Sequence, residues 1–286
     1  MKLGFIGLGT MGMPMVENLL KKGYEVHAYD VVKDRLSAAA EKGARIKKTS
    51  QEVAKDCDIV LLSLPKREIS LQVCLGSDGI LETMKKGGVI VELSTVPPST
   101  VLEISKEAKK SGVEVLDAPV SGGRAGAEKG ELTIMVGGNK QTFERCKGIF
   151  ESIGKRVFYV GELGSAEAIK LLNSLLAISN LLVAREALII AKNQKLDLQK
   201  LHEVVEASTG QSWMWSNWVK GILRGVKTGS TPRIMMKDMS YALEMVENSD
   251  MKLGISRRVL EEISSLITER NIDSDAALLF DIVTNP

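Results

Sequence analysis

The length and composition of the sequence limit the kinds of protein that it can encode. A chain of 286 residues exceeds most single compact domains, so we expect two domains. Its 38 basic and 36 acidic side chains nearly balance, which argues against a nucleic-acid-binding surface. No uninterrupted apolar run reaches the roughly eighteen residues of a membrane span, and no signal peptide precedes the first strand pattern. Three scattered cysteines and two histidines predict a protein of the reducing cytoplasm without a metal site.

The first half of the chain alternates short apolar strands with amphipathic helices. This alternation predicts an α/β domain with a doubly wound parallel sheet of the Rossmann type, which we expect to cover residues 1–163. The expected strands are residues 2–6, 24–29, 58–63, 89–92, 113–117, 133–136 and 157–160. The first two helices are expected at residues 11–22 and 33–42.

The second half of the chain has a helical pattern. Apolar residues recur at helical spacing over residues 164–193, which predicts one interdomain helix about 43 Å long. No comparable strand pattern follows, so residues 194–286 are expected to form an all-helical domain for substrate binding and oligomerisation. The long apolar helix and the tryptophans predict a homodimer or homotetramer.

A glycine-rich segment lies between the first expected strand and the first expected helix. It fits the pattern G-x-G-x-x-G, which permits a tight turn and a close approach of backbone to a diphosphate. The positive end of the following helix also favours an anion. The predicted cofactor-binding residues of this segment are Gly7, Leu8, Gly9, Thr10, Met11 and Gly12.

An acidic residue, Asp30, follows the second expected strand at the spacing of a ribose ligand. Its carboxylate would repel a 2′-phosphate, so NAD is predicted in preference to NADP. The basic Lys33 and Arg35 nearby would tolerate a phosphate, and a simple turn aspartate is the alternative interpretation. The turn residues Leu64 and Pro65 also follow a strand, and this position predicts contact with the cofactor.

Four blocks of residues, in order over nearly the whole chain, share the pattern of one enzyme family. The blocks are Gly4 to Met15 with Asn18 and Leu19; Asp117 to Gly123 with Gly126, Ala127, Gly130, Leu132, Thr133 and Val136 to Gly138; Gly161, Gly164, Lys170 and Asn173; and Lys237 with Asp238. With these blocks the sequence resembles the β-hydroxyacid dehydrogenases, among them 3-hydroxyisobutyrate dehydrogenase, tartronate semialdehyde reductase and glyoxylate/succinic semialdehyde reductase. The resemblance implies an oxidoreductase that interconverts a small 3-hydroxy acid and its semialdehyde with a nicotinamide cofactor.

The resemblance also implies roles for the matched residues. Lys170 corresponds to the catalytic lysine of the family, the general acid and base. The implied substrate-binding residues are Ser121, Gly122, Gly123, Asn173, Ser174 and Trp213. The implied further cofactor contacts are Thr95 and Lys237.

Without the resemblance, the residues around Lys170 are compatible with either a catalytic or a structural role for this lysine. Apolar neighbours would lower the pKa of its amine, which suits acid–base chemistry near neutral pH. The alternative is a structural lysine whose stem packs against apolar groups while its charged head reaches water. Two departures from the family concern the pocket: Ser174 replaces a usual asparagine, and Ser230 replaces a frequent phenylalanine. Both departures put the identity of the substrate in doubt.

Four alternative functions remain at this point. A 6-phosphogluconate-type dehydrogenase is disfavoured by the short helical domain and the lack of a phosphate cluster. A glyoxylate/succinic semialdehyde reductase would use the same residues on another aldehyde. An imine reductase shares the scaffold, but such enzymes generally lack the lysine that Lys170 provides. A catalytically silent dinucleotide-binding module is disfavoured by the joint presence of Ser121, Lys170 and Lys237.

Overall fold

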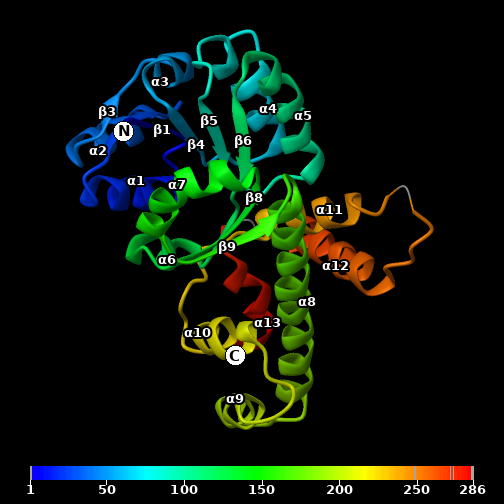
Figure 1. The fold of residues 1–286 in the computed structure, drawn as a ribbon. Coiled ribbons are helices and arrows are strands. Elements are labelled where there is room, and N and C mark those ends of the chain that lie inside the picture. The colour runs from blue at the N-terminus through cyan, green and yellow to red at the C-terminus, as the bar shows by residue number, and fades with distance from the viewer. Residues whose placement is uncertain (1, 248, 271, 273, 285–286) are drawn as a thin grey trace. The chain divides into compact units, whose positions relative to one another are not determined.

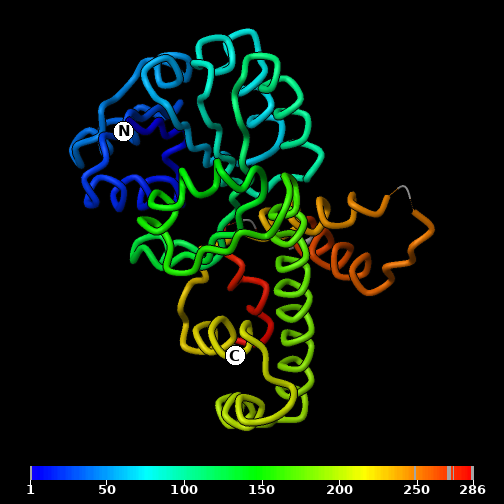
Figure 2. The backbone as a smooth tube through the Cα atoms, viewed as in Figure 1, coloured from blue at the N-terminus to red at the C-terminus, as the bar shows by residue number. Residues whose placement is uncertain are grey.

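Two compact units make up the chain. The computed structural model describes residues 2–247, 249–270, 272 and 274–284. Its first unit is Met1–Lys170 and its second is Leu171–Pro286. Helix α8 (Ser165–Asn193) runs without interruption through the boundary, as the ribbon and the backbone tube show (Figures 1 and 2). The predicted long helix is therefore confirmed.

A twisted sheet forms the first unit, with the strand order β3-β2-β1-β4-β5-β6-β8-β7 and with β9 paired to β8. The strands are β1 (Lys2–Ile6), β2 (Glu25–Tyr29), β3 (Arg45–Ile46), β4 (Ile59–Leu62), β5 (Val89–Glu92), β6 (Glu114–Asp117), β7 (Val120–Ser121), β8 (Leu132–Gly138) and β9 (Gly154–Gly161). All seven expected strands are present, and the strands from β3 to β6 are mutually parallel. The predicted α/β fold class is thus confirmed.

The sheet departs from the predicted parallel arrangement around β8. Strand β8 runs antiparallel to β6 and β7, with Leu116 opposite Gly138 and Val120 opposite Ile134. Only helix α6 (Gly123–Lys129) separates β7 from β8. Its seven residues span about 10 Å, too short to carry the chain back to the far end of the sheet for a parallel return. The two-residue strands β3 and β7 escaped prediction because so short a segment shows no alternation.

Helices cover both faces of this sheet (Figure 1). They are α1 (Gly12–Lys21), α2 (Lys33–Glu41), α3 (Ser50–Asp56), α4 (Arg67–Leu75), α5 (Pro98–Ala108), α6 and α7 (Lys140–Ile153). One core lies between the sheet and α1 and α7, and includes Leu19 and Phe150. The other lies under α3, α4 and α5, and includes Val53 and Ile104. The sheet is therefore buried on both faces, as its continuous apolar strands require.

In the residues that the structure describes, the second unit contains helices joined by loops, and no strand. Besides most of α8 it contains α9 (Leu198–Glu206), α10 (Lys220–Ile222), α11 (Pro232–Glu244), α12 (Gly254–Arg270) and α13 (Asp281–Thr284). Its core combines Leu181 and Leu188 of α8 with Met239 of α11, Ile263 of α12 and Phe280 near the C-terminus. The expectation of an all-helical second half is confirmed.

Helix α8 is long and apolar enough, by length and composition alone, to cross a membrane. The sequence argument missed this because scattered polar residues interrupt its apolar runs. Of the most apolar window of α8, 44% is buried within the structure, where Leu181 and Leu188 pack into the helical core. We therefore interpret α8 as a core helix with one uncovered side.

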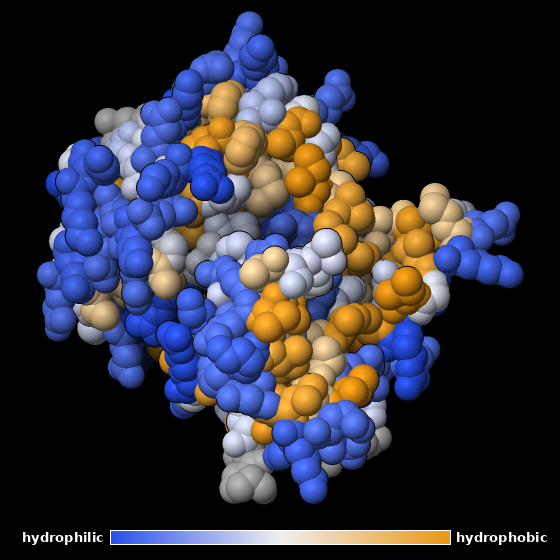
Figure 3. Space-filling view, turned by 90° about the horizontal axis from the view of Figure 1, so that it is seen from below, coloured by the Kyte–Doolittle hydropathy of each residue, from blue (hydrophilic) through white to orange (hydrophobic). Residues whose placement is uncertain are grey.

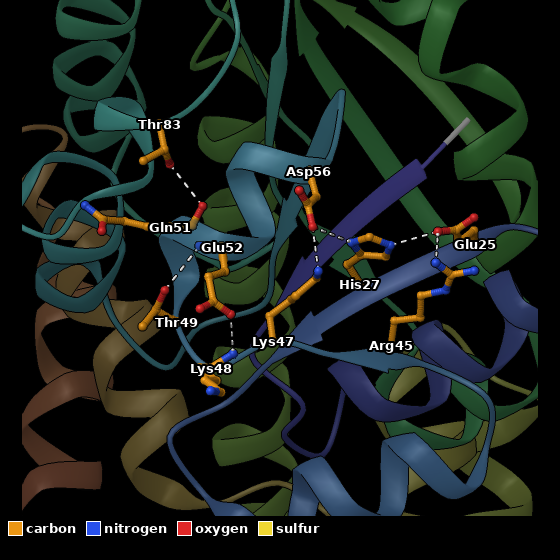
Figure 4. Close-up of polar contacts among 10 residues, drawn as sticks. All are labelled: Glu25, His27, Arg45, Lys47, Lys48, Thr49, Gln51, Glu52, Asp56 and Thr83. Carbon is orange, nitrogen blue, oxygen red and sulfur yellow. Dashed lines mark hydrogen bonds and ion pairs between the residues drawn. The ribbon is translucent and has the colours of Figure 1, made fainter.

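A chain of polar contacts links β2 to the segment after β3 and to the end of α3 (Figure 4). The buried His27 lies between two carboxylates, with Nε2 2.9 Å from Oε1 of Glu25 and Nδ1 3.7 Å from Oδ2 of Asp56. Its hydrogen bond to Glu25 lowers the pKa of that carboxyl from its usual 4.5. The hydrogen bond from the Lys47 ammonium lowers the pKa of Asp56 from its usual 3.8.

These two lowered pKa values predict the direction of the acid response. A carboxyl with a lowered pKa in the folded state stabilises the fold above its unfolded pKa, and this contribution is lost as the pH falls through the folded pKa. The free energy of unfolding of the wild type, measured by urea denaturation from pH 7 down to pH 3, should therefore fall more steeply than that of Glu25→Gln/Asp56→Asn. The exposed Asp78→Asn serves as control and should follow the wild type. Parallel curves for the wild type and the double variant would contradict the argument.

Candidate active site

The glycine turn between β1 and α1 is packed too closely for other side chains at two positions. A Cβ on Gly7, whose φ is +97°, would lie 2.2 Å from the carbonyl oxygen of Ser63. A Cβ on Gly12 would lie 1.9 Å from the carbonyl oxygen of Gly7. Both glycines are therefore required for the turn to pass close to the end of β4 and enter the helix.

The outer side of the same turn is open. A Cβ on Gly9 would meet only the Nη1 atom of Arg35, at 3.9 Å. Helix α1 begins at Gly12, and its N-cap Met11 makes no side-chain hydrogen bond to the first turn. The amide groups at this helix end are thus not capped by a side chain, and the space above Gly9 suits a diphosphate. These residues fit the predicted dinucleotide cofactor.

Asp30 lies at the end of β2 and is buried. Its Oδ2 accepts a hydrogen bond from the backbone amide of Leu8 at 2.7 Å, and its Oδ1 accepts one from Val32 at 2.8 Å. The Nη1 atom of Arg35 is 3.4 Å from Oδ2. The carboxylate therefore fixes the glycine turn, and its charge is partly balanced by Arg35.

A cleft of about 320 Å³ adjoins the glycine turn. It is lined by Gly9, Thr10, Met13, Pro14, Glu17, Arg124 and Glu128. Arg124 and Glu128 form an ion pair of 2.7 Å on α6. The cleft extends the predicted diphosphate region along α1 and does not include Ser121 or Lys170.

The carboxyl ends of β4 and β5 are joined by hydrogen bonds. The backbone amide of Leu64 donates to Oγ of Ser94 at 2.7 Å. The amide of Ser94 in turn donates to Oε1 of the buried Glu92 at 3.0 Å. The predicted cofactor residues Leu64 and Thr95 therefore stand on two turns that are held to each other, while Pro65 is exposed beside them.

A second set of hydrogen bonds anchors the start of α8 to the sheet. The amide of Glu167 donates to Oδ2 of Asp117, the last residue of β6, at 2.9 Å. Oε2 of Glu167 accepts from the amide of Val96, next to Thr95, at 3.2 Å. Burial raises the pKa of Asp117, and the amides of Glu167, Gly164 and Ala166 oppose this shift.

The predicted catalytic lysine lies one turn beyond this anchor. Lys170 is half-buried on α8, three residues after Glu167, and is the last residue of the first unit. The predicted substrate loop begins at Ser121, four residues after Asp117, and continues through Gly122 and Gly123 into α6. The structure therefore connects the lysine and the loop to the same strand end.

The remaining predicted residues lie in the second unit. The Oγ atom of Ser174 donates to Oδ2 of the buried Asp238 at 2.9 Å, whereas Asn173 is exposed. Lys237 of α11 lies 3.2 Å from Oδ1 of Asp238 and 5.2 Å from the ring centre of Tyr241. The hydroxyl of Ser174 is thus directed to a carboxylate within its own unit.

The three tryptophans are buried to different degrees, as their spacing requires, because it does not place all three on one face of a helix. Trp215 is buried and stacks on His202 with ring centres 5.6 Å apart, and Trp218 packs partly against the same core. Trp213, the one predicted as a pocket residue, is exposed.

Ser230, like Ser174, departs from the family pattern, because it replaces a frequent phenylalanine. Its carbonyl oxygen accepts a hydrogen bond from the amide of Ala276 at 2.8 Å.

Sequence reasoning missed three residues of the site: Glu92, Asp117 and Glu167. All three are acids with no exposed surface, and each accepts a backbone hydrogen bond near a predicted cofactor or substrate residue. A usable signal was present, because Glu92 and Asp117 each end an apolar strand and charged residues are rarely buried without a partner.

The fold and the turn define a dinucleotide-binding protein, and comparisons with known proteins narrow the class. Residues 2–161 match the family model described as the NAD binding domain of 6-phosphogluconate dehydrogenase. Residues 164–281 match that described as NAD-binding of NADP-dependent 3-hydroxyisobutyrate dehydrogenase.

Several similar proteins of known name are dehydrogenases. The chain is 38% identical to 2-(hydroxymethyl)glutarate dehydrogenase of Eubacterium barkeri, over 89% of this chain and 85% of that protein. It is 35% identical to mitochondrial 3-hydroxyisobutyrate dehydrogenase of Mus musculus, over 84% of this chain and 74% of that protein. The structure of 3-hydroxyisobutyrate dehydrogenase of Mycobacterium tuberculosis with L-serine matches with a TM-score of 0.89 and 25% identity, over 98% and 97% of the two chains. The chain belongs to the β-hydroxyacid dehydrogenase family of NAD(P)-binding oxidoreductases.

The hydrogen bond of Asp117 yields a test of how α8 is anchored. Asp117→Ala should lower the free energy of unfolding by about 1–3 kcal/mol, because the buried amide of Glu167 loses its acceptor. Asp117→Asn retains an acceptor oxygen and is the matched control. Urea denaturation of the three proteins measures the difference.

The raised pKa of Asp117 adds a pH dependence with a definite sign. An acid whose pKa is raised in the folded state stays protonated there while the unfolded chain ionises, so its contribution to stability falls as the pH rises through that range. Asp117→Asn should therefore gain stability relative to the wild type as the pH rises above about 4, near the usual pKa of an aspartate. A difference between the two proteins that does not change with pH would refute this effect.

Proposed function

We propose that the protein interconverts a small 3-hydroxy carboxylic acid and its semialdehyde, with NAD as cofactor and Lys170 as general acid and base. One observation carries the proposal: the hydrogen bond between Glu167 and Asp117 ties the helix of Lys170 to the strand that leads into Ser121. A candidate proton donor and a candidate carboxylate-binding loop thus share one anchoring point in the first unit.

The chemistry follows from the residue types. The glycine turn and Asp30 would hold a nicotinamide cofactor, which would supply the hydride chemistry when bound. The hydroxyl of Ser121 and the amides of Gly122 and Gly123 donate hydrogen bonds to the substrate carboxylate. In oxidation the neutral amine of Lys170 takes the proton of the substrate hydroxyl, and in reduction its ammonium returns a proton to the forming alcohol.

The names of the relatives support this class of substrate. 3-Hydroxyisobutyrate and 2-(hydroxymethyl)glutarate both carry a hydroxyl group on the carbon β to a carboxylate. The second of these is a dicarboxylate, so a panel of substrates should include acids with one and with two carboxylates. Glyoxylate and succinic semialdehyde belong in the panel for the reductive direction.

We also propose the cofactor preference, the location and the assembly. Asp30 supports NAD over NADP, and the three free cysteines suit a reducing cytoplasm. Lys237 is proposed as a cofactor-binding residue, and Asn173 and Trp213 are proposed as substrate-binding residues. Copies of the chain are proposed to assemble into a homodimer or homotetramer through their helical units.

The cofactor preference can be measured directly. The ratio of kcat/KM for NAD over NADP should be at least about tenfold, or about 1.4 kcal/mol, because a 2′-phosphate would meet the carboxylate of Asp30. Asp30→Asn keeps an acceptor for the amide of Leu8 and should reduce this ratio. Equal or faster turnover with NADP would refute the preference, and loss of NADP turnover in Arg35→Ala would then identify Arg35 as the phosphate ligand.

The role of Lys170 is the central test of the proposed reaction. Lys170→Ala should lose about 10²–10⁴ in kcat, the usual share of general acid–base catalysis. NADH binding, measured by fluorescence titration, should persist, because the glycine turn and Asp30 lie on other elements. Turnover of the wild type should rise with pH in oxidation and fall with pH in reduction, since the two directions need opposite protonation states of the amine.

An exposed lysine supplies the control for this experiment. Lys147→Ala on α7 should retain wild-type kcat. A folded, NADH-binding Lys170→Ala protein with most of its kcat would assign proton transfer to another group, with Lys237 the next to be tested. Absence of turnover with the whole panel in the wild type would instead refute the substrate class.

A further inference from the structure

The cleft beside the glycine turn contains charged side chains that the proposed reaction does not use. Its lining residues, all in the first unit, are Gly9 and Thr10 of the turn, Met13, Pro14 and Glu17 of α1, and Arg124 and Glu128 of α6. Hydrophilic side chains cover much of the surface in Figure 3, so an exposed arginine alone does not indicate a site. Arg124 differs from other surface arginines because it shares a cleft with the turn that would hold a diphosphate.

A buried hydrogen bond fixes α6 against α1. The side chain of Asn18 on α1 donates from Nδ2 to the carbonyl oxygen of Ala127 on α6, at 2.7 Å. Ala127 is itself buried in the core on the α1 side of the sheet. The two helices that form the walls of the cleft are therefore held together. Arg124 lies three residues before Ala127, so its backbone has a fixed position relative to the glycine turn.

The ion pair of Arg124 with Glu128 uses one nitrogen of the guanidinium. Nε of Arg124 donates to Oε1 of Glu128 at 2.7 Å, one turn further along α6. Among the residues that the structure describes, none accepts a hydrogen bond from the terminal nitrogens Nη1 and Nη2 of Arg124. A guanidinium is a planar fork that suits the oxygens of a phosphate or a carboxylate. Glu128 thus orients the guanidinium and leaves its terminal nitrogens able to bind a second oxyanion.

The two acids of the cleft each have a basic partner. Oε1 of Glu17 lies 3.7 Å from Nζ of Lys42, and Glu128 is paired with Arg124. Ion pairs that water reaches contribute little to stability, so an incoming oxyanion can compete with Glu128 for the guanidinium. The positive end of the α1 dipole acts in the same direction, because α1 begins at Gly12, directly after the glycine turn. The charges around the cleft therefore favour an anion next to the turn.

We propose that Arg124 binds the diphosphate of the dinucleotide cofactor from the side of α6, and that Glu128 is the positioning residue for its guanidinium. This inference deepens the proposed function and rests only on its nicotinamide cofactor. The glycine turn offers amide dipoles to the negatively charged diphosphate, and Arg124 adds a full positive charge from a second element.

The second carboxylate of a dicarboxylic substrate is the competing source of an oxyanion. Arg124 directly follows Gly123, the last residue of the candidate substrate loop. Among the residues that the structure describes, however, the cleft is lined by Gly9 and Thr10 and not by Ser121. We therefore favour the diphosphate, and the experiment below separates the two sources.

The test measures cofactor binding in the absence of turnover. Arg124→Gln should raise the Kd of NADH about tenfold in a fluorescence titration, because a charge-assisted hydrogen bond is lost. The Kd of ADP-ribose, measured by displacement of NADH, should rise by the same factor, since ADP-ribose keeps the diphosphate and lacks the nicotinamide. Glu128→Gln retains an acceptor for Nε and removes a negative charge, so it should bind NADH at least as tightly as the wild type. Lys129→Gln is the matched control: it removes an equal charge from α6 outside the cleft and should leave the Kd unchanged.

The variants at positions 124 and 128 distinguish an anion ligand from a structural ion pair. Weaker binding in Arg124→Gln together with undiminished binding in Glu128→Gln supports the proposal, whereas an ion pair that only stabilises α6 would make the two substitutions act alike and would overturn it. A Kd that rises for NADH and not for ADP-ribose also overturns it, because the arginine would then act at the nicotinamide end.

An unchanged Kd of NADH in Arg124→Gln overturns the proposal as well. If kcat/KM for 2-(hydroxymethyl)glutarate then falls relative to that for 3-hydroxyisobutyrate, Arg124 is assigned to the second carboxylate of the substrate. A wild type that binds NADH but turns over no substrate of the panel would refute the proposed reaction alone, since the binding measurements do not depend on catalysis.

Discussion

The hydrogen bond from the backbone amide of Glu167 to the carboxylate of Asp117 fixes the position at which helix α8 leaves the sheet. An anion at the N-terminus of a helix is favoured by the unpaired amides and the helix dipole, and more strongly where water is excluded. Because α8 is regular from its first residue, fixing Glu167 also fixes the angular position of Lys170. The orientation of the candidate catalytic amine therefore depends on a strand-end aspartate that need not touch substrate.

Hydrogen bonds of the same kind occur at the carboxyl ends of several strands of the sheet. Buried carboxylates there accept hydrogen bonds from backbone amides of neighbouring turns: Asp30 from Leu8, Glu92 from Ser94, Asp117 from Glu167 and Glu167 from Val96. Burial of such acids costs free energy, but a buried acid whose hydrogen bonds are satisfied holds its partners rigidly in place. The turns that line the candidate site are consequently held in place before any ligand binds, which reduces the ordering that binding must impose.

The periodicity of the sequence was sufficient to predict the seven long strands and helix α8, because their apolar patterns are local. It did not predict the antiparallel return of β8, which depends on the short reach of α6 and on pairing across the sheet. The glycine turn and Asp30 could be located from spacing, since the chemistry of a diphosphate dictates that spacing. The contacts of Glu167 with Asp117 and Val96 could not be predicted from spacing, nor could the contact between Ser174 and Asp238. These contacts join residues 50 to 71 positions apart.

The burial of the cysteines has a consequence for following the motions of the protein. Burial raises the pKa of Cys57 to about 12 and that of Cys146 to about 11, and raises the pKa of Cys74 as well. The thiolate is the form that reacts with alkylating agents and peroxides, so the folded protein should resist both. All three thiols belong to the first unit. Their rate of alkylation therefore reports how often the nucleotide-binding unit opens, while opening of the helical unit leaves it unchanged.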